Sequence, residues 1–254
     1  MHSYDLRNSP KCPFGELRWK KYYWEYPQEA PDYNDGYWGE TVDPDGKTRN
    51  MLSEAERKKQ ISELQFIIDK IHERAPGKII DIGCGPGNLL SAIDSNWEKH
   101  GVDLSQTALE LAKKYAQVKK GEFLNLNYPS QHFDVVVLHH VIEHLAEPVQ
   151  YIEESRRVLK REGLIILSTP DFDSGCARRF KKNFRMLHDK GHISLFTKLS
   201  LVKMLEDFNF RILEVECPFF ETRWFSKKNL LRMFDISKIS PPFYGNHITI
   251  TALK

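Results

Sequence analysis

The sequence is poor in cysteine and has no long apolar run. Its four cysteines, Cys12, Cys84, Cys176 and Cys217, stand far apart without a C-x-x-C pair, which argues against a zinc knuckle or a disulfide framework. No apolar run approaches the roughly 18 residues that a membrane span needs. The opening residues also lack the apolar stretch of a signal peptide. We therefore expect a cytoplasmic protein with reduced thiols and no membrane partner.

Charge of one sign is not in excess overall, but it is unevenly distributed. The net charge is +2 over 254 residues, whereas residues 176–254 contain fifteen Lys and Arg against seven Asp and Glu, which is about +8. This asymmetry favours an anionic partner for the C-terminal part, although a solvated basic face explains it equally well. The length predicts one core with additions, since two full domains would need a longer chain.

The first 52 residues are rich in aromatics, Pro, Gly and Asp and show no periodicity. Because so many large aromatic side chains need a surface to pack on, we expect residues 1–52 to form an N-terminal segment ordered against the core. A capping box at Ser53-x-x-Glu56 then begins a helix with apolar residues at helical spacing, which Ala75-Pro76-Gly77 ends.

Short apolar runs alternate with helical patterns from there on. The predicted strands are KIIDIG, KHGVDLS, GEFLNLN, FDVVVLH, LIILSTP, FRILEVE and HITITALK. Helices are predicted from residue 88, from residue 108, through Val149 to an end at Gly163, and from Thr197. The alternation predicts an α/β fold with a mostly parallel sheet and helices on both faces. We expect residues 53–171 to form the ligand-binding core, and residues 172–254 to complete the sheet and supply two irregular basic caps, 172–196 and 217–245.

A glycine-rich loop follows the first predicted core strand, in DIGCGPGN (81–88). Glycines there let the backbone approach a ligand and present amide N–H groups at a helix N-terminus. The dinucleotide fingerprint G-x-G-x-x-G would need a third glycine at position 88, which is Asn88. Asp81 would repel a pyrophosphate at this place but would attract an ammonium group.

A second acid, Asp103, closes the next strand, where a carboxylate can hold the two hydroxyls of a ribose. A ligand with a ribose, an ammonium group and a carboxylate, but without phosphates, fits both acids. This description matches S-adenosylmethionine. A fold of this type that has lost its ligand is the alternative.

With these motifs the chain resembles the class I S-adenosylmethionine-dependent methyltransferases, over roughly residues 53–215 and the final strand. KIIDIGCGPGNLL is similar to their first motif, GVDLS to the ribose-binding strand, and FDVVVLHHVIEHLAEP to the motif of the fourth strand. The resemblance implies a Rossmann-like seven-stranded sheet whose last strand is antiparallel. It also implies the following cofactor-binding residues: Asp81, Gly83, Cys84, Gly85, Gly87, Asp103, Leu104, Asn125, Leu126 and His139. At Asn125 the family often has an acid instead.

The stretch LHHVIEH (138–144) contains H-x-x-E-H, a pattern of one class of zinc peptidase. Those enzymes place both histidines on one continuous helix, whereas here the histidines leave a strand. We therefore predict no metal site. The carboxyl ends of parallel strands bind ligands in open α/β sheets, so His140 is a candidate catalytic base, with a structural or substrate-orienting role as the alternative. His192, before the Thr197 helix, is a second catalytic candidate, with capping or packing as the alternative, and His188 and Tyr37 are weaker ones.

Methyl transfer needs a base when the acceptor is a hydroxyl, and a neutral histidine can supply it. Basic residues of the caps could bind phosphates of the acceptor (Arg178, Arg179, Lys181, Lys182, Arg185, Arg223, Lys227, Lys228 and Arg232), and Tyr23, Trp24, Tyr37 or Trp38 could stack on a sugar or base. We predict an O-methyltransferase for a small polar, anionic acceptor, most plausibly a sugar or nucleotide-linked sugar, and no DNA partner. The alternatives are an RNA methyltransferase, although no RNA-binding module is recognisable, and a non-catalytic scaffold subunit.

Overall fold

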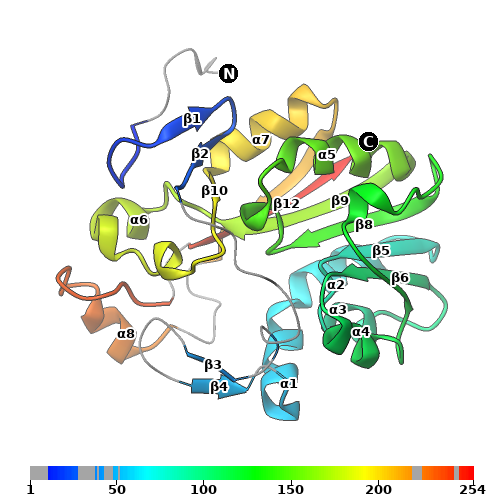
Figure 1. Ribbon diagram of the computed structural model, residues 1–254, viewed down its shortest axis with the longest axis horizontal. Coiled ribbons are helices and arrows are strands. Elements are labelled where there is room, and N and C mark those ends of the chain that lie inside the picture. Colours follow the sequence, from blue (N-terminus) through cyan, green and yellow to red (C-terminus); the bar gives the residue numbers. More distant parts are fainter. Residues whose placement is uncertain are drawn as a thin grey trace.

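The computed structural model describes residues 11–27, 38, 40–42, 48–50, 52–218, 225–242 and 246–254. Its centre is a seven-stranded sheet in the order β11-β12-β9-β8-β5-β6-β7 (Figure 1). Its strands are β5 (Lys78–Ile82), β6 (Glu98–Asp103), β7 (Gln117–Lys120), β8 (Phe133–His139), β9 (Leu159–Pro170), β11 (Arg211–Glu216) and β12 (His247–Leu253). β12 runs antiparallel to both of its neighbours, and the pairs from β9 to β7 are parallel. The predicted sheet, with its antiparallel last strand, is confirmed.

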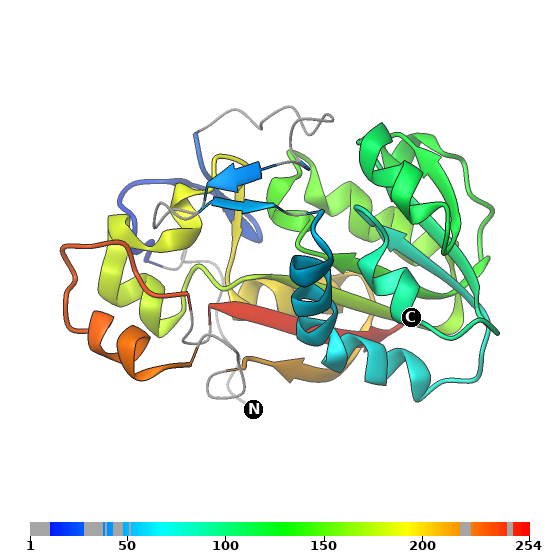
Figure 2. The same cartoon turned by 90° about the horizontal axis from the view of Figure 1, so that it is seen from below.

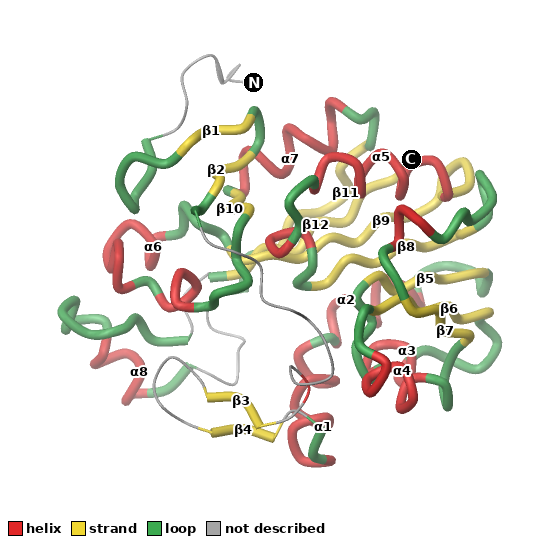
Figure 3. The backbone as a smooth tube through the Cα atoms, viewed as in Figure 1, coloured by secondary structure: helices red, strands yellow, loops and turns green. Residues whose placement is uncertain are grey.

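Helices cover both faces of this sheet (Figures 2 and 3). They are α1 (Glu54–Glu63), α2 (Gln65–His72), α3 (Asn88–Ala92), α4 (Gln106–Ala112), α5 (Pro148–Val158) and α7 (Lys198–Asp207). Successive residues of β8 alternate between the two faces, as side chains of a strand must. Val136 and Leu138 pack in the cluster under α5 and α7, whereas Val135 and Val137 pack in the cluster under α2 and α3.

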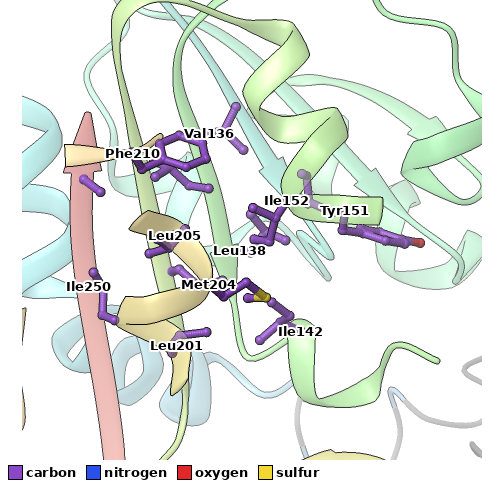
Figure 4. Packing of buried hydrophobic residues seen from close by; sticks show 14 of the residues in the cluster. Val136, Leu138, Ile142, Tyr151, Ile152, Leu201, Met204, Leu205, Phe210 and Ile250 are labelled. Atoms are coloured by element: carbon purple, nitrogen blue, oxygen red, sulfur yellow. The ribbon is translucent and has the colours of Figure 1, made fainter. Parts of the chain in front are cut away.

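The larger of these two cores lies between the sheet and the pair α5 and α7. Ile152 of α5 and Met204 of α7 meet Leu138 of β8 and Ile250 of β12 there, and all four side chains are fully buried (Figure 4). Because apolar burial drives folding in proportion to the area removed from water, this packing fixes the strands whose carboxyl ends carry the predicted ligand residues.

The third parallel strand lies earlier in the chain than predicted. The strand β7 is Gln117–Lys120, and GEFLNLN instead contains the 3-10 helix η2 (Phe123–Asn125). Phe123 is buried in the large core, which explains its apolar pattern without a strand. β7 is the edge of the sheet, and edge strands carry lysines that disfavour further pairing. Apolar periodicity therefore could not identify it.

Two helix predictions are also corrected. The helix expected from Ser53 to the Ala75-Pro76-Gly77 stop is divided at Leu64 into α1 and α2, so that α2 packs on the sheet while α1 reaches α3. Ser53 caps α1 as predicted, since its hydroxyl accepts the N–H of Glu56. The helix expected to end at Gly163 ends at Val158, because Leu159 already pairs with Phe133 as the first residue of β9.

The segment 172–196 is more ordered than its polar sequence suggested. It forms α6 (Gly175–Phe180), the 3-10 helices η4 (Lys181–Asn183) and η5 (Arg185–His188), and β10 (Ser194–Phe196). Phe172, Phe180 and Phe184 are buried together with Trp24 in a third apolar cluster. β10 pairs with β2 (Tyr23–Glu25), which pairs with β1 (Arg18–Lys20), and these elements lie together where β12 begins (Figure 1). We call this unit the cap.

Three further elements complete the described structure: β3 (Glu40–Val42) pairs with β4 (Thr48–Asn50), and α8 (Lys227–Arg232) lies between β11 and β12 in the sequence. Within the described residues, no helix combines the length and the apolarity that crossing a bilayer demands.

Candidate active site

The glycine loop has the backbone conformation that its sequence requires. Gly83, Gly85 and Gly87 all have positive φ, at 71°, 51° and 79°, which L-residues with a side chain rarely adopt. A Cβ on Gly83 would lie 2.4 Å from a methyl group of Val141, and one on Gly85 would lie 2.3 Å from the ring of Trp38. The loop is therefore in close contact with the β8 exit on one side and with Trp38 on another.

Asp103 is part of the glycine loop's own hydrogen bonding. Its Oδ2 accepts the N–H of Gly85 at 2.8 Å and its Oδ1 accepts the N–H of Ser105 at 2.9 Å. These bonds fix the carboxylate at the end of β6, and each oxygen keeps a further lone pair for a ligand hydroxyl. Leu104 beside it exposes 39% of its surface, which leaves an apolar side chain next to the acid that is predicted to bind the ribose.

Asp81 is buried on the neighbouring strand, where β5 pairs with β6. Burial, together with the charge of Asp103, raises the pKa of Asp81 to about 8. A carboxylate that is hard to ionise by itself becomes easy to ionise when a cation arrives. The pair of acids therefore fits the ammonium group and the ribose of S-adenosylmethionine, and does not fit a pyrophosphate.

The other residues implied for the cofactor lie around this edge. Cys84 points away from it, because its sulfur packs against Gly101 and the α4 side of the loop, so only its backbone is available. Asn125 ends η2 with an exposed side chain, and Leu126 follows it, packed on the large core. Both come after Gly121, whose N–H donates to the carbonyl of Asp103. Glu122 is closer in the sequence to the end of β7 than Asn125 is. The prediction of a strand in GEFLNLN hid this acid, because it placed Glu122 inside the strand.

The exit of β8 brings two histidines to the same edge. His139 is the last residue of the strand, and its Nδ1 is buried without a hydrogen-bond partner. Desolvation and the neighbouring His140 hold the pKa of His139 well below its usual range. His140 has a left-handed backbone with φ of 55°, which turns the chain sharply where it leaves β8. Its side chain is 34% exposed, so it is accessible from outside.

Glu143 is the fully buried centre of the histidine cluster. Its Oε1 accepts from Nδ1 of His140 at 3.0 Å, and its Oε2 accepts from the hydroxyl of Thr169 at 3.0 Å. Burial alone would raise the pKa of Glu143, but the hydrogen bond from His140 and the charges of the surrounding histidines outweigh it and lower that pKa. Because an ionised carboxylate only accepts, Nδ1 of His140 carries the proton and Nε2 has the free lone pair.

His192 is more enclosed than His140. Its Nδ1 lies 2.6 Å from the carbonyl of Met186, its Nε2 lies 4.0 Å from Oε1 of Glu143, and its ring packs against His144 at 4.8 Å. The structure therefore places both predicted catalytic histidines on one carboxylate. His188 is exposed on η5, and Tyr37 lies outside the described residues.

His247 joins this cluster and was not predicted from the sequence. Its ring lies 4.8 Å from that of His140, and burial lowers its pKa to about 3. Its position offered a signal, since the first residue of an antiparallel last strand lies at the carboxyl edge of the parallel ones. Glu143 had a signal too, in its H-x-x-E spacing from His140.

The predicted acceptor contacts of the cap are only partly supported. Tyr23 and Trp24 are buried in apolar clusters and cannot stack on a substrate, which corrects that prediction. Trp38 lies on the glycine loop instead.

Two of the predicted basic residues have partners within the protein. Arg178 pairs with Asp173, and Arg179 donates to the carbonyl of Met233. Arg185 lies on η5 near the histidine cluster: burial is the main cause of the low pKa of His247, and the charge of Arg185 adds a minor lowering. Arg223 lies outside the described residues.

Two groups of side chains in the described structure have the spacing of metal ligands. Glu143, His144 and His192 form one, and Glu98, His100 and His132 form the other; within each group the candidate ligand atoms lie within 4.8 Å of one another. The second lies at the amino end of β6, where Lys78 also binds Glu98 and already balances its charge. The absence of a metal remains a prediction for the first group.

Comparison with known proteins places this geometry in context. A family model described as a methyltransferase domain matches residues 52–215. A ubiquinone biosynthesis O-methyltransferase of Haemophilus ducreyi is 32% identical over 105 residues, which are 36% of this chain and 44% of that protein. An uncharacterised protein encoded in a Streptomyces fradiae transposon is 30% identical over 118 residues, which are 42% of this chain and 34% of that protein. The matches thus span a third to less than half of the length of these two curated relatives.

The fold has solved counterparts. The structure of a SAM-dependent methyltransferase from Archaeoglobus fulgidus superposes with a TM-score of 0.60 at 18% identity, and covers 78% of this chain and 94% of that one.

Proposed function

The chain belongs to the class I S-adenosylmethionine-dependent methyltransferases, and from this premise we propose that it methylates a hydroxyl group of a small polar acceptor, with His140 as the general base. The observation that carries the proposal is the 3.0 Å contact between Nδ1 of His140 and the buried carboxylate of Glu143. A base held by a third group in this way is oriented and has a fixed tautomer.

Different residues of the chain bind the cofactor and move the proton. Asp81 and Asp103 hold the amino group and the ribose of the cofactor, and the glycine loop lets the ligand approach the backbone. When bound, S-adenosylmethionine supplies a methyl group on a positively charged sulfur, which leaves as a neutral thioether. His140 takes the proton from the acceptor hydroxyl at Nε2 while that oxygen bonds to the methyl carbon. Glu143 stabilises the imidazolium so formed.

His192 has a positioning role in this proposal. It is 5% exposed, and its Nε2 lies 4.0 Å from Oε1 of Glu143, the oxygen that accepts from His140. The cap holds Glu143 through the neighbouring residue, because the N–H of Ile193 donates to the carbonyl of Glu143 at 2.9 Å, while Thr169 holds the carboxylate from β9.

The acceptor that we propose is a sugar, or a nucleotide-linked or phosphorylated sugar. Arg185 supports an anionic acceptor, because it is a basic residue on η5, near the histidine cluster. Arginine binds phosphate oxygens with two parallel donors. The kinship with ubiquinone biosynthesis O-methyltransferases supports oxygen as the methylated atom.

The test is to assay His140→Ala and Glu143→Gln with a panel of UDP- and dTDP-sugars, following the mass gain of one methyl group. We expect kcat to fall by about 10²–10⁴-fold for His140→Ala, because general-base catalysis has that magnitude. The dissociation constant of S-adenosylmethionine, measured by calorimetry, should remain unchanged. The exposed histidine variant His188→Ala is the matched control and should keep full turnover. The proposal would be contradicted if the protein methylated RNA and none of the sugars, or if His140→Ala had normal turnover.

A further inference from the structure

Exposed apolar side chains in the described structure are concentrated in one short segment. Nine large apolar residues are exposed, and five of them fall between residues 225 and 236. We call these five side chains the α8 patch: Phe225, Leu230, Leu231, Phe234 and Ile236. Leu231 and Phe234 are 70% and 75% exposed. Single exposed apolar residues are normal on any protein, but a cluster of this kind marks an interaction surface.

The α8 patch is held in place by the cap and is not a loose tail. Arg179 donates to the carbonyl of Met233 at 2.8 Å, and the amide of Asn183 donates to the carbonyl of Ile236 at 2.9 Å. Met233 turns inward and packs on the third apolar cluster. The segment thus directs Met233 toward the protein and exposes the five side chains of the α8 patch.

Basic residues surround the patch. Residues 225–242 contain Lys227, Lys228, Arg232 and Lys238 against a single acid, Asp235, which is paired with Lys238 at 3.1 Å. The neighbouring η4 adds two exposed lysines of the cap, at positions 181 and 182. α6, which leads into η4, and α8 lie on the same side of the molecule in both views (Figures 1 and 2).

From this combination we propose that the α8 patch docks the enzyme on an anionic lipid surface. Segments that lie in the interface of a membrane combine leucine and phenylalanine with lysine and arginine. Their apolar side chains insert into the membrane, and their cations bind the anionic headgroups. A protein partner fits less well. Lysine is depleted in protein interfaces, and a stable interface needs about 20–30 residues on each side, whereas the patch has five.

This proposal revises the expectation of no membrane partner, which rested on the lack of a spanning segment. It is independent of the methyl acceptor, because it invokes no residue of the histidine cluster. The α8 patch lies beside the cap, which stands at the carboxyl edge of the sheet (Figure 1). Docking through it would therefore place the lipid surface on the side of the molecule that carries the cap.

The test is co-sedimentation of the full chain with phosphatidylcholine vesicles that contain phosphatidylglycerol, and with vesicles of phosphatidylcholine alone. We expect binding to the anionic vesicles, weakened by added salt, and at least about tenfold weaker binding by the double variant Leu231→Ser, Phe234→Ser. The control is Leu199→Ser, Leu213→Ser, since these two residues are also exposed apolar side chains, at 50% and 49%, but lie on α7 and β11. This variant should bind like the unmodified protein. Affinity for S-adenosylmethionine should be the same in all three proteins.

Absence of binding to both vesicle types would overturn the proposal, as would equal binding by the patch variant. Size-exclusion chromatography distinguishes a protein partner: if the unmodified chain is a dimer that Leu231→Ser, Phe234→Ser dissociates, the patch is an interface between two copies, and the lipid assignment is wrong.

Discussion

At the scale of single residues, the charge of Asp103 disfavours ionisation of Asp81 before any ligand binds. Asp81 is buried near Asp103, and its pKa of about 8 means that the folded protein keeps a proton there which the unfolded chain releases near the ordinary value of 3.8. The folded state therefore binds more protons between these two values. The contribution of Asp81 to stability therefore falls as pH rises through this window and then levels off.

We predict that Asp81→Asn stabilises the unliganded protein, because an amide cannot ionise. The gain should grow with pH, and the rise in Tm should be at least about 2 °C larger at pH 8 than at pH 5. The same variant should bind S-adenosylmethionine at least about tenfold more weakly, since an ammonium group loses its partner.

Asp134→Asn serves as the control for this effect. Asp134 is partly exposed, and its carboxylate accepts from Lys160 and from the N–H of Lys78, which together lower its pKa despite partial burial. Its stabilising contribution is present above its unfolded pKa and is lost as pH falls, so Asp134→Asn should destabilise at pH 8. Equal effects of the two variants would show that Asp81 is ionised in the free protein.

At the scale of secondary-structure elements, the cap is a packed unit. Segments far apart in the sequence, β1 and β2 with α6 and β10, share one apolar cluster. Phe184 illustrates this, because it is fully buried and its ring stacks on that of Phe14 with centroids 6.1 Å apart. The cap thereby supplies His192 to the active site on a rigid support.

We predict that Phe184→Ala lowers the free energy of unfolding by about 3–5 kcal/mol, the usual cost of deleting a buried aromatic ring. Leu199→Ala, at a half-exposed position of α7, should change it by less than about 0.5 kcal/mol. Urea unfolding followed by tryptophan fluorescence measures both, since Trp24 lies inside the cluster. If the two variants had the same stability, the cap would not be packed as described.

At the scale of the whole molecule, we expect the carboxyl edge of the sheet to select its ligand by charge. The carboxyl ends of β5 and β6 carry the two acids, with a glycine loop that has Asn88 at the third glycine position of the dinucleotide fingerprint. A pyrophosphate placed there would meet Asp81, whereas the amino group of S-adenosylmethionine would be attracted to it.

We predict that S-adenosylmethionine and its demethylated form stabilise the protein, while ATP and NAD do not. At a ligand concentration about one hundred times its dissociation constant the stabilisation is about 2.7 kcal/mol, and the expected rise in Tm is about 5 °C. Thermal denaturation with each compound measures this, and Asp103→Ala should respond to none of them. A comparable shift with NAD would show that the acids do not exclude pyrophosphate.

The sequence by itself determined the fold class and the cofactor, because both depend on local signals. Strand and helix periodicity is written in consecutive residues, and the D-x-G-x-G-x-G loop and Asp103 each stand directly after a strand. Such signals survive without knowledge of long-range contacts. Where the local pattern was misleading, as in GEFLNLN, burial of Phe123 in the core imitated a strand, and the true edge strand β7 had no apolar pattern to detect.

Only the tertiary structure decided the composition of the histidine cluster and the surface of the cap. Glu143, Thr169, His192 and His247 come from four places in the chain, and only sheet pairing and the cap bring them together. The same packing buries Tyr23 and Trp24 and leaves Phe234 exposed, although all three are large aromatic residues in irregular sequence. Long-range contacts decide which side chains of such a segment are buried, and the amino-acid composition of the segment contains no information about those contacts.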